Sequence, residues 1–305
     1  MKVVMKKEKK KIPIVFTFDD NYALPAAVAI KSLVHTGNKD TWYDIYCLYQ
    51  NLSDANRRAL DQVAKINWIK VDSSLFHGVP VTAEYPVDVY YRLAIHDILP
   101  QYDRILYSDV DVLFQGDLTS VYEMDMEDAY WAGVPLEKNE VPSPETLAAQ
   151  VGNPDDPKFM SGHTKFTENN NDLIFASGFM VINAKKMRED RMTEKFLETI
   201  KKFSGRLKMF DLEVLNLTCQ NGTIKSLPFE CCVLEDIAVA TDYRKTNLYP
   251  FLSRVFSDKE LQHAIRRPVI LHYTGANEVR VWRREEKNQP LQYCFFFSMV
   301  AGLLI

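Results

Sequence analysis

Two aspartates two positions apart, Asp109 and Asp111, follow a run of apolar residues that begins after Arg104. A carboxylate inside a buried strand costs free energy unless it is paired, so the strand is predicted to end near Ser108. Both acids then emerge at its carboxyl edge, where open α/β sheets bind ligands. Side chains two residues apart in an extended chain point the same way, so these carboxylates could share one divalent cation. The alternative is a turn whose acids face solvent, and a lone Asp-x-Asp does not decide between them.

Apolar patterns on both sides of this motif predict alternating strands and helices. Ser53 and Asn183 are the expected N-caps of two helices, and Gly37 is expected to end the first helix. This alternation predicts an α/β fold with right-handed crossovers and a mainly parallel sheet. The expected strands are residues 14–18, 43–49, 66–71, 104–108, 129–134, 174–182 and 268–273. The expected helices lie between the first two strands and over residues 53–65, 87–99, 183–203 and 210–219.

The composition describes a folded protein without a strongly basic surface. The chain has 305 residues, of which 47% are hydrophobic, and its formal net charge is −4. Nucleic acid is therefore not expected as the main partner. An anionic small ligand would need local neutralisation, which a bound metal supplies. The five cysteines are an odd number and form no Cys-x-x-Cys, as expected for a reduced protein of the cytoplasm.

The domain boundaries are predicted from changes of composition. Residues 1–11 form a lysine-rich tail that lacks the apolar core of a secretory signal, although a weak attraction to anionic lipid is an alternative. Residues 12–283 form one domain. Within it, residues 137–172 are rich in proline, glycine and asparagine, which interrupt helices and strands. This segment is expected to form a lid or an acceptor-binding insertion, or to be partly disordered. Residues 284–305 are expected to form a docked helix too short for a membrane span. The expected location is the cytoplasm, with at most peripheral contact at the inner face of the membrane.

Four separated motifs together resemble the family 8 retaining glycosyltransferases. This family includes bacterial lipopolysaccharide galactosyl- and glucosyltransferases and glycogenin. The resemblance covers about residues 12–283, and the patterns of residues 175–183 and 211–216 agree with it. The four motifs are Thr17-Phe-Asp-Asp-Asn-Tyr22, Tyr91-Arg92, Ser108-Asp-Val-Asp111 and His272-Tyr-Thr-Gly275.

The resemblance implies a GT-A fold, which is a Rossmann-like nucleotide-sugar domain, and a requirement for Mn²⁺, with Mg²⁺ as an alternative. Asp109 and Asp111 match the metal-binding pair of the family, and His272 matches its third protein ligand. Carboxylate and diphosphate oxygens suit a hard divalent ion, and one imidazole among them favours Mn²⁺ over Mg²⁺. The metal would stabilise the charge that develops on departing UDP.

Further site residues are implied by the same resemblance. Asp19 would accept a hydrogen bond from uracil and Tyr22 would stack on the base. The structural alternative for this stretch is a capped turn between strand and helix. The implied nucleotide-binding residues are Thr17, Asp19, Asn21, Tyr22, Asp109, Val110, Gly275 and Arg280. The implied sugar-binding residues are Arg92, Ser177, Gly178 and Asp211, and the catalytic candidates among them are Arg92 and Asp211.

Three departures from the family pattern bear on the donor sugar and on activity. Ala176 stands where the family usually has an asparagine, and Leu212 stands where it has a glutamine. The ending from His272 to Trp282 has two extra residues, lacks the proline and carries Arg280 in place of lysine. Leu212 cannot be a nucleophile. Asp211 could be one, but we favour a same-face substitution, which needs no protein nucleophile.

The leading hypothesis is a transferase that moves glucose or galactose from a UDP-sugar to a saccharide or glycolipid acceptor of the cell-surface glycan or lipopolysaccharide type. One alternative is a UDP-sugar-binding protein with lost or altered transfer, suggested by Ala176 and Leu212. Another is a phosphatase of the haloacid dehalogenase type, suggested by Asp109-Val-Asp111-Val. That fold needs its motif on the first strand and offers no role for His272.

Overall fold

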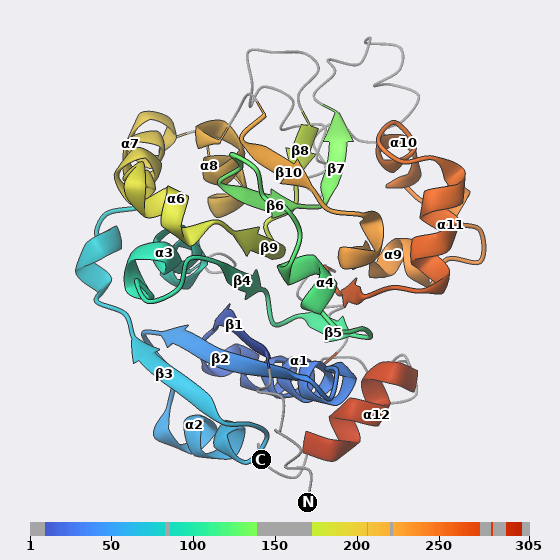
Figure 1. Ribbon diagram of the computed structural model, residues 1–305, viewed down its shortest axis with the longest axis horizontal. Coiled ribbons are helices and arrows are strands. Elements are labelled where there is room, and N and C mark those ends of the chain that lie inside the picture. Colours follow the sequence, from blue (N-terminus) through green and yellow to red (C-terminus); the bar gives the residue numbers. More distant parts are fainter. Residues whose placement is uncertain are drawn as a thin grey trace, which may run out of the picture.

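A seven-stranded sheet forms the centre of the molecule (Figure 1), in the order β10-β6-β9-β4-β1-β2-β3. The computed structural model describes residues 10–82, 86–138, 173–205, 207–219, 222–274, 282 and 291–300. The strands of the sheet are β1 (Lys10–Thr17), β2 (Thr41–Tyr49), β3 (Ile66–Lys70), β4 (Ile105–Ser108), β6 (Trp131–Gly133), β9 (Phe179–Ile182) and β10 (Ile224–Ser226).

Parallel pairing dominates this sheet. Only β9 runs against its neighbours β4 and β6, while the other four pairs are parallel. Strands buried on both faces are typical of such sheets, and β1 shows this because Ile14 and Phe16 enter one hydrophobic core while Val15 enters the other. The predicted α/β fold with a mainly parallel sheet is confirmed.

Helices cover both faces of the sheet. The first core contains α1 (Ala23–Thr36) and residues of the carboxyl-terminal part of the chain, and the second contains α7 (Met192–Phe203) and α8 (Asp211–Thr218). The remaining α-helices are α2 (Asp54–Asp61), α3 (Ile95–Ile98), α4 (Thr119–Tyr122), α6 (Ala184–Glu189), α9 (Glu235–Ala238), α10 (Tyr249–Leu252), α11 (Asp258–Arg266) and α12 (Leu291–Val300). The 3₁₀ helices are η1 (Asp20–Tyr22), η2 (Ser73–Phe76), η3 (Val87–Ala94), η5 (Phe229–Cys231) and η6 (Tyr243–Lys245).

Two small sheets complete the structure. In one of them β12 lies between β11 and β5, and the other is an antiparallel pair of β7 and β8. Their strands are β5 (Val112–Phe114), β7 (Pro135–Lys138), β8 (Leu173–Phe175), β11 (Val233–Leu234) and β12 (Ile270–His272). The three-stranded sheet directly continues β4, because only residues 109–111 separate β4 from β5.

Several predicted elements are divided in the structure. The single strand predicted over residues 174–182 is wrong, because Ala176, Ser177 and Gly178 separate β8 from β9. The helix predicted over residues 183–203 begins at its expected cap but breaks at Arg191, whose φ of 54° lies in the left-handed region.

Other elements begin or end at residues that differ from the predicted ones. Residues 87–99 form η3 and α3 instead of one α-helix. An apolar repeat of three residues suits a 3₁₀ helix as well as an α-helix, so the sequence did not distinguish the two helix types. The helix capped by Ser53 ends at Asp61 instead of residue 65. Strand β1 begins at Lys10, inside the predicted tail over residues 1–11.

Parts of the predicted domain plan lie outside the described residues. Of the insertion predicted over residues 137–172, the first two residues belong to β7 and the rest is outside the described ranges. Of residues 284–305, the described part is α12, which packs against α1. None of the helices in the described ranges combines the length and apolar content that crossing a membrane requires.

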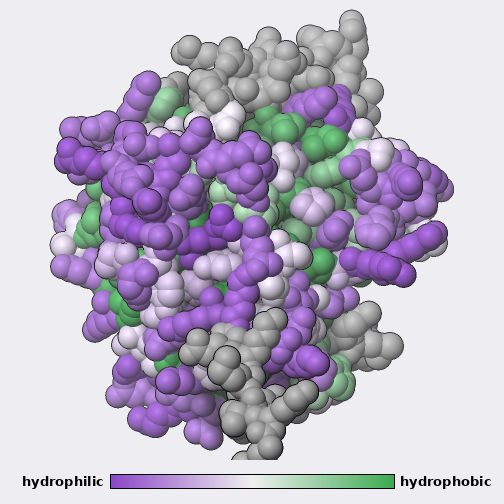
Figure 2. Space-filling view, viewed as in Figure 1, coloured by the Kyte–Doolittle hydropathy of each residue, from purple (hydrophilic) through white to green (hydrophobic). Residues whose placement is uncertain are grey.

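The face of the molecule seen in Figure 2 is largely hydrophilic over α6 and α7, while hydrophobic side chains gather around β7 and α10. Four cysteines, Cys47, Cys219, Cys231 and Cys232, are buried free thiols.

Candidate active site

The pairing of β5 with β12 brings the two ends of the predicted site together. Their antiparallel register places His272 opposite Val112, the residue after Asp111. The backbone N–H of Tyr273 donates to the carbonyl of Asp111 at 2.9 Å, which continues the register by one more bond. An imidazole 161 positions further along the chain therefore lies beside the Asp-x-Asp motif.

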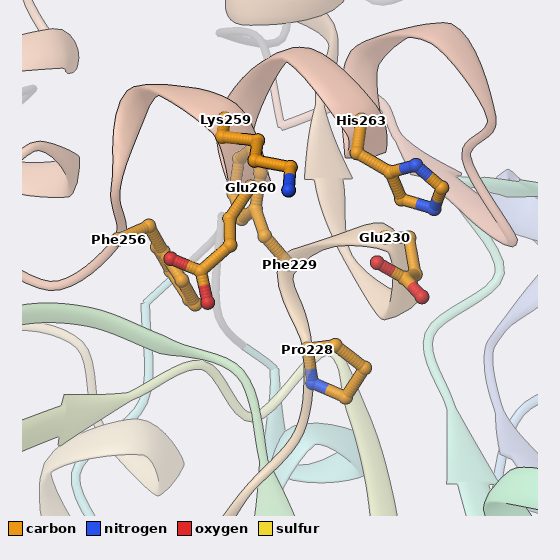
Figure 3. Close-up of a pocket in the computed structure, with 7 residues that line it drawn as sticks. All are labelled: Pro228, Phe229, Glu230, Phe256, Lys259, Glu260 and His263. Atoms are coloured by element: carbon orange, nitrogen blue, oxygen red, sulfur yellow. The ribbon is translucent and has the colours of Figure 1, made fainter.

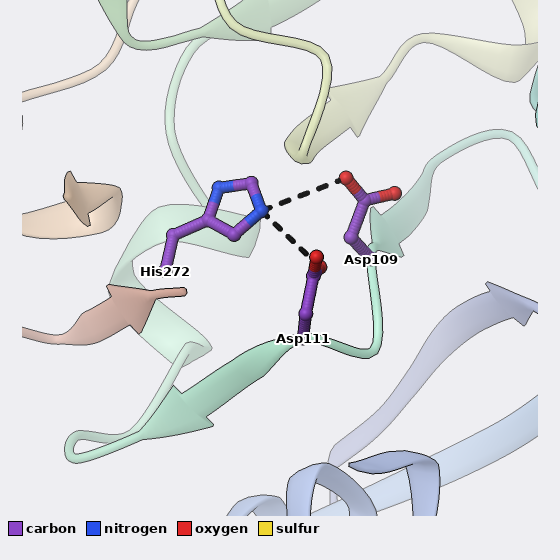
Figure 4. A group of neighbouring side chains, drawn as sticks. All are labelled: Asp109, Asp111 and His272. Carbon is purple, nitrogen blue, oxygen red and sulfur yellow. Dashed lines mark hydrogen bonds and ion pairs between the residues drawn. The ribbon is translucent and has the colours of Figure 1, made fainter. Parts of the chain in front are cut away.

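Asp109, Asp111 and His272 point toward one another (Figure 4). The imidazole Nε2 lies 3.2 Å from Oδ1 of Asp111 and 3.8 Å from Oδ2 of Asp109. One potential ligand atom from each residue lies within 4.8 Å of the others. Two carboxylates and one imidazole are a donor set suited to Mn²⁺, so the residues present fit a divalent cation.

The surroundings of the His272 imidazole favour its positively charged form. Burial alone would lower the pKa of His272, but Cys232 and Asp111 hold that pKa well above its usual range. Asp109 and Asp111 are only partly buried, so a ligand can approach their carboxylates. A divalent cation bound here would replace the proton on Nε2 of His272, and the carboxylates of Asp109 and Asp111 would stabilise its charge.

Arg92 connects this group to a second acid. Its Nη2 lies 2.9 Å from Oδ1 of Asp109, and its Nη1 lies 3.1 Å from Oδ2 of Asp211. Nη1 also donates to the carbonyl of Ser177 at 3.0 Å, and the guanidinium stacks 4.4 Å from the centre of the Tyr107 ring. Arg92 is 7% exposed, so its charge is compensated almost entirely by these groups.

Asp211 is the first residue of α8 and is held from two sides. The Ser177 hydroxyl donates to its Oδ2 at 2.9 Å, beside the contact from Arg92. Burial raises the pKa of Asp211 to about 6, although Arg92 acts in the opposite direction. Three of the four residues predicted to bind the sugar, Arg92, Ser177 and Asp211, thus form one buried network.

Gly178, the fourth of those residues, lies against the metal-ligand candidates. A Cβ added there would overlap Cε1 of His272 and lie 2.9 Å from its Nδ1 and 3.1 Å from Oδ2 of Asp109. The Gly178 carbonyl accepts a hydrogen bond from the backbone N–H of Asp109 at 2.8 Å. The absence of a side chain therefore leaves the space that the imidazole occupies.

Residues at the carboxyl end of β1 form the capped turn of the structural alternative, and their role in binding uridine stays a prediction. Asp19 accepts hydrogen bonds from the backbone and the side chain of Asn21, at 3.0 and 2.9 Å, so it caps η1 as the structural alternative requires. Thr17 contacts the Tyr107 hydroxyl at 3.2 Å, and that hydroxyl donates to Asp109 at 2.7 Å. The ring of Tyr22 meets Trp282 edge to face at 5.5 Å.

The remaining residues predicted to bind the nucleotide are Val110, Gly275 and Arg280. The Val110 side chain is buried in the hydrophobic core, so it is not available to bind a ligand. Gly275 and Arg280 lie outside the described residues. Their roles in nucleotide binding stay predictions.

Three residues near the site were missed by the sequence reasoning. Tyr107 joins Thr17 to Asp109, and Cys232 contacts His272. Asp88 of η3 is buried near Asp19, and burial, followed by the charge of Asp19, raises its pKa to about 6. Its Oδ1 has no hydrogen-bond partner among the described residues. An acid inside the apolar stretch of residues 87–95 was the one signal in the sequence for Asp88.

The model of the family described as "Glycosyl transferase family 8" matches residues 13–286. The chain belongs to glycosyl transferase family 8. Its relatives include a lipopolysaccharide 1,2-glucosyltransferase of Escherichia coli, 26% identical over 280 residues, which cover 88% of this chain and 73% of the relative. A putative glycosyltransferase of Haemophilus influenzae is 22% identical, with coverage of 89% and 73%.

Solved structures of glycosyltransferases share the fold. The galactosyltransferase LgtC in complex with donor and acceptor sugar analogs has a TM-score of 0.71 and 20% identity, covering 95% of this chain and 96% of LgtC. The glycosyltransferase GlyE of Streptococcus pneumoniae has a TM-score of 0.59 and 19% identity, covering 97% of this chain and 62% of GlyE. This family 8 protein therefore has the predicted GT-A fold, and the phosphatase alternative is wrong.

Proposed function

We propose that this family 8 glycosyltransferase moves a hexose, glucose or galactose, from a UDP-sugar to a saccharide acceptor of the cell-surface glycan or lipopolysaccharide type, and that it depends on a divalent cation, preferably Mn²⁺. The observation that carries the proposal is the convergence of Asp109, Asp111 and His272 within 4.8 Å, next to the Arg92–Asp211 network. The relatives named for lipopolysaccharide glucosyl transfer and for galactosyl transfer support the class of donor and acceptor.

The chain would hold the cation with Asp109, Asp111 and His272, whose potential ligand atoms face one another. When bound, the cation supplies Lewis-acid stabilisation of the negative charge on the departing diphosphate. Arg92 would keep the Asp109 carboxylate oriented, because its guanidinium pairs with one oxygen and leaves the other toward His272.

The donor would lie along the carboxyl edge of β1 and β4. Thr17, Asp19, Asn21 and Tyr22 would bind the uridine, and the backbone of Val110 would contact the nucleotide. Gly275 and Arg280 would bind the phosphates by the family resemblance. This edge is the position at which open α/β sheets bind ligands.

Arg92, Ser177 and Asp211 would bind the donor sugar and fix its orientation, with Gly178 lining the same region. Oδ2 of Asp211 is already engaged by Arg92 and by the Ser177 hydroxyl, which suits a residue that positions the sugar rather than one that attacks it. In the same-face substitution, the acceptor oxygen bonds to the anomeric carbon as the bond to the diphosphate oxygen breaks. The acceptor proton passes to that diphosphate oxygen, so retention needs no nucleophile from the chain.

A protein with UDP-sugar affinity but lost or altered transfer is the second candidate. Ala176 and Leu212 are both buried and adjoin Ser177 and Asp211, so two polar side chains usual in the family are replaced by apolar ones next to the proposed sugar site. A changed donor sugar would explain the same replacements.

The decisive experiment measures UDP release from UDP-glucose and UDP-galactose, with Mn²⁺ or chelator and with or without a lipopolysaccharide core saccharide. We expect Mn²⁺-dependent release that the saccharide accelerates, and a loss of about 100-fold or more in Asp111→Asn. Binding of UDP and Mn²⁺ by calorimetry without sugar transfer from either donor would favour the second candidate. Absence of Mn²⁺-dependent UDP binding would overturn both.

A further inference from the structure

The His272 ring has a second polar neighbour on the side away from the carboxylates. Its Nδ1 lies 3.4 Å from Sγ of Cys232, while Nε2 faces Asp109 and Asp111. Both side chains are buried, with His272 7% and Cys232 1% exposed. The two ring nitrogens thus have separate surroundings, one acidic and one provided by a thiol.

A histidine that binds a metal through one nitrogen usually donates the N–H of the other to a fixed acceptor, which sets the tautomer and the ring orientation. We propose that Cys232 is this positioning residue: its sulfur accepts the Nδ1–H of His272 and keeps the Nε2 lone pair directed at the space shared with Asp109 and Asp111. The inference rests on the proposed function, because it assigns a support to the cation site proposed there.

The backbone holds Cys232 rigidly in this position. Its N–H donates to the Phe229 carbonyl at 3.0 Å, which closes η5, and the next two residues form β11. In the parallel pairing of β11 with β12, Leu234 lies opposite His272. The thiol therefore lies directly before β11, and the imidazole lies in the neighbouring strand β12.

The turn that carries Cys232 is also packed against α11. The rings of Phe229 and Phe256 lie 5.3 Å apart, and they line a cavity of about 290 Å³ between η5 and α11 (Figure 3). Glu260 in this cavity caps α11 together with Ser257, so its carboxylate already has a structural role. None of the metal-ligand candidates lines this cavity. The contact between Phe229 and Phe256 packs the turn against the segment that leads into α11.

Gly178 also lies against the ring, since an added Cβ would lie 2.9 Å from Nδ1 of His272 and closer still to its Cε1. The imidazole thus packs closely against both Gly178 and Cys232. With rotation restricted in this way, a change of the acceptor at Cys232 acts on ring orientation and tautomer.

The test compares Cys232→Val, which removes the acceptor at similar size, with Cys232→Ser, which keeps an acceptor. Cys231→Val is the matched control, because Cys231 is the preceding residue and equally buried, and its thiol is not bonded to His272. Mn²⁺ affinity is measured by calorimetry in the presence of UDP. We expect Cys232→Val to weaken Mn²⁺ binding about 10- to 100-fold, Cys232→Ser to recover part of the loss, and Cys231→Val to bind like the wild type.

Two further readouts separate positioning from general damage. The first is the ratio of Mn²⁺ to Mg²⁺ affinity, which should fall in Cys232→Val because the imidazole is the ligand that favours Mn²⁺. The second is the ¹⁴N modulation of a coordinated imidazole in the pulsed EPR spectrum of bound Mn²⁺, which should weaken in that variant. Thermal unfolding verifies that each variant is folded.

The possible outcomes distinguish a failure of the Cys232 inference from a failure of the proposed cation site. Unchanged affinity, ion preference and ¹⁴N signal in Cys232→Val would overturn the inference while leaving the proposed function intact. An equal loss in Cys231→Val would overturn it too, because the effect would then belong to the turn. Failure of the wild-type protein to bind Mn²⁺ with UDP would remove the proposed cation site and this inference together.

Discussion

Arg92 holds the two acidic groups of the site in a fixed relation to each other. One guanidinium nitrogen pairs with Asp109 and another with Asp211, while the ring of Tyr107 covers its face. A planar fork can make these contacts at once, whereas an ammonium group is a point charge. The arrangement therefore depends on the shape of the cation as well as on its charge.

The first prediction concerns Arg92→Lys. Lysine keeps the positive charge but cannot bridge Asp109 and Asp211 together, so we expect transfer to fall about 100-fold or more with a small loss of stability. Arg92→Met, which leaves the buried Asp211 and the partly buried Asp109 without their cation, should cost about 3–5 kcal/mol in the free energy of unfolding. Steady-state kinetics and urea unfolding measure the two effects. Near-normal turnover in the lysine variant would contradict the bridging role.

The second prediction concerns Glu137 of β7, which is 1% exposed and whose Oε2 has no hydrogen-bond partner among the described residues. Burial raises its pKa from 4.5 to about 7, with Arg254 acting in the opposite direction. Between these two values the folded protein keeps a proton that the unfolded chain has lost. Stability from this group is therefore complete below about pH 4.5 and lost as pH rises through about 7.

Glu137→Gln should remove that dependence. The variant should match the wild type near pH 4 and exceed it at pH 8, by up to about 3 kcal/mol in the free energy of unfolding. Denaturant unfolding across this pH range measures the difference, with Glu189→Gln on the exposed side of α6 as the control. A constant difference at all pH values would show that another interaction of Glu137 dominates.

At the scale of elements, the break between β8 and β9 is the feature that builds the site. Residues 176–178 leave the strand pairing, and the carbonyls of Ser177 and Gly178 instead accept hydrogen bonds from Arg92 and from the backbone of Asp109. A continuous strand would have used these groups in the sheet. The irregular turn thus connects the Arg92–Asp211 network to the Asp-x-Asp turn.

The third prediction tests that turn with Gly178→Ala. The new Cβ would displace the His272 ring and crowd Oδ2 of Asp109, so Mn²⁺ affinity should fall at least about tenfold, at a stability cost of about 1–3 kcal/mol. Gly205→Ala is the matched control, because a Cβ there meets nothing within 4 Å. Calorimetry with Mn²⁺ and UDP measures the affinity. Normal binding in Gly178→Ala would show that the ring has room elsewhere.

At the scale of the whole molecule, the sequence predicted the elements whose signals are local. The end of β4 at Ser108 follows from the cost of burying two acids, and the end of α1 and the caps at Ser53 and Asn183 follow from their residue types. The short strands β5, β10 and β11 carry too few residues for a periodic pattern, so their pairing could not be foreseen.

The approach of His272 to Asp109 and Asp111 was predicted only through the family resemblance. Its physical cause is the register of β12 on β5, a contact between segments far apart in the chain. The roles of Tyr107 and Cys232 were missed for the same reason, because an aromatic residue and a cysteine in apolar runs are typical of any core. Local patterns predict elements, and long-range register decides which side chains meet.

The last prediction follows from that long-range register. The metal-ligand candidates come from the β4–β5 turn and from β12, so ligand binding would tie the two regions of the chain together and stabilise the fold. With UDP at saturation and Mn²⁺ at about 100 times its dissociation constant, the gain is about 2.7 kcal/mol, which corresponds to a rise in Tm of about 4–5 °C. His272→Ala should lose most of this rise, while the exposed-helix variant His263→Ala, on α11, should keep it. Scanning calorimetry with and without chelator measures the shift. An equal rise in both variants would mean that the cation binds away from β12, and the site built from Asp109, Asp111 and His272 would then be disproved.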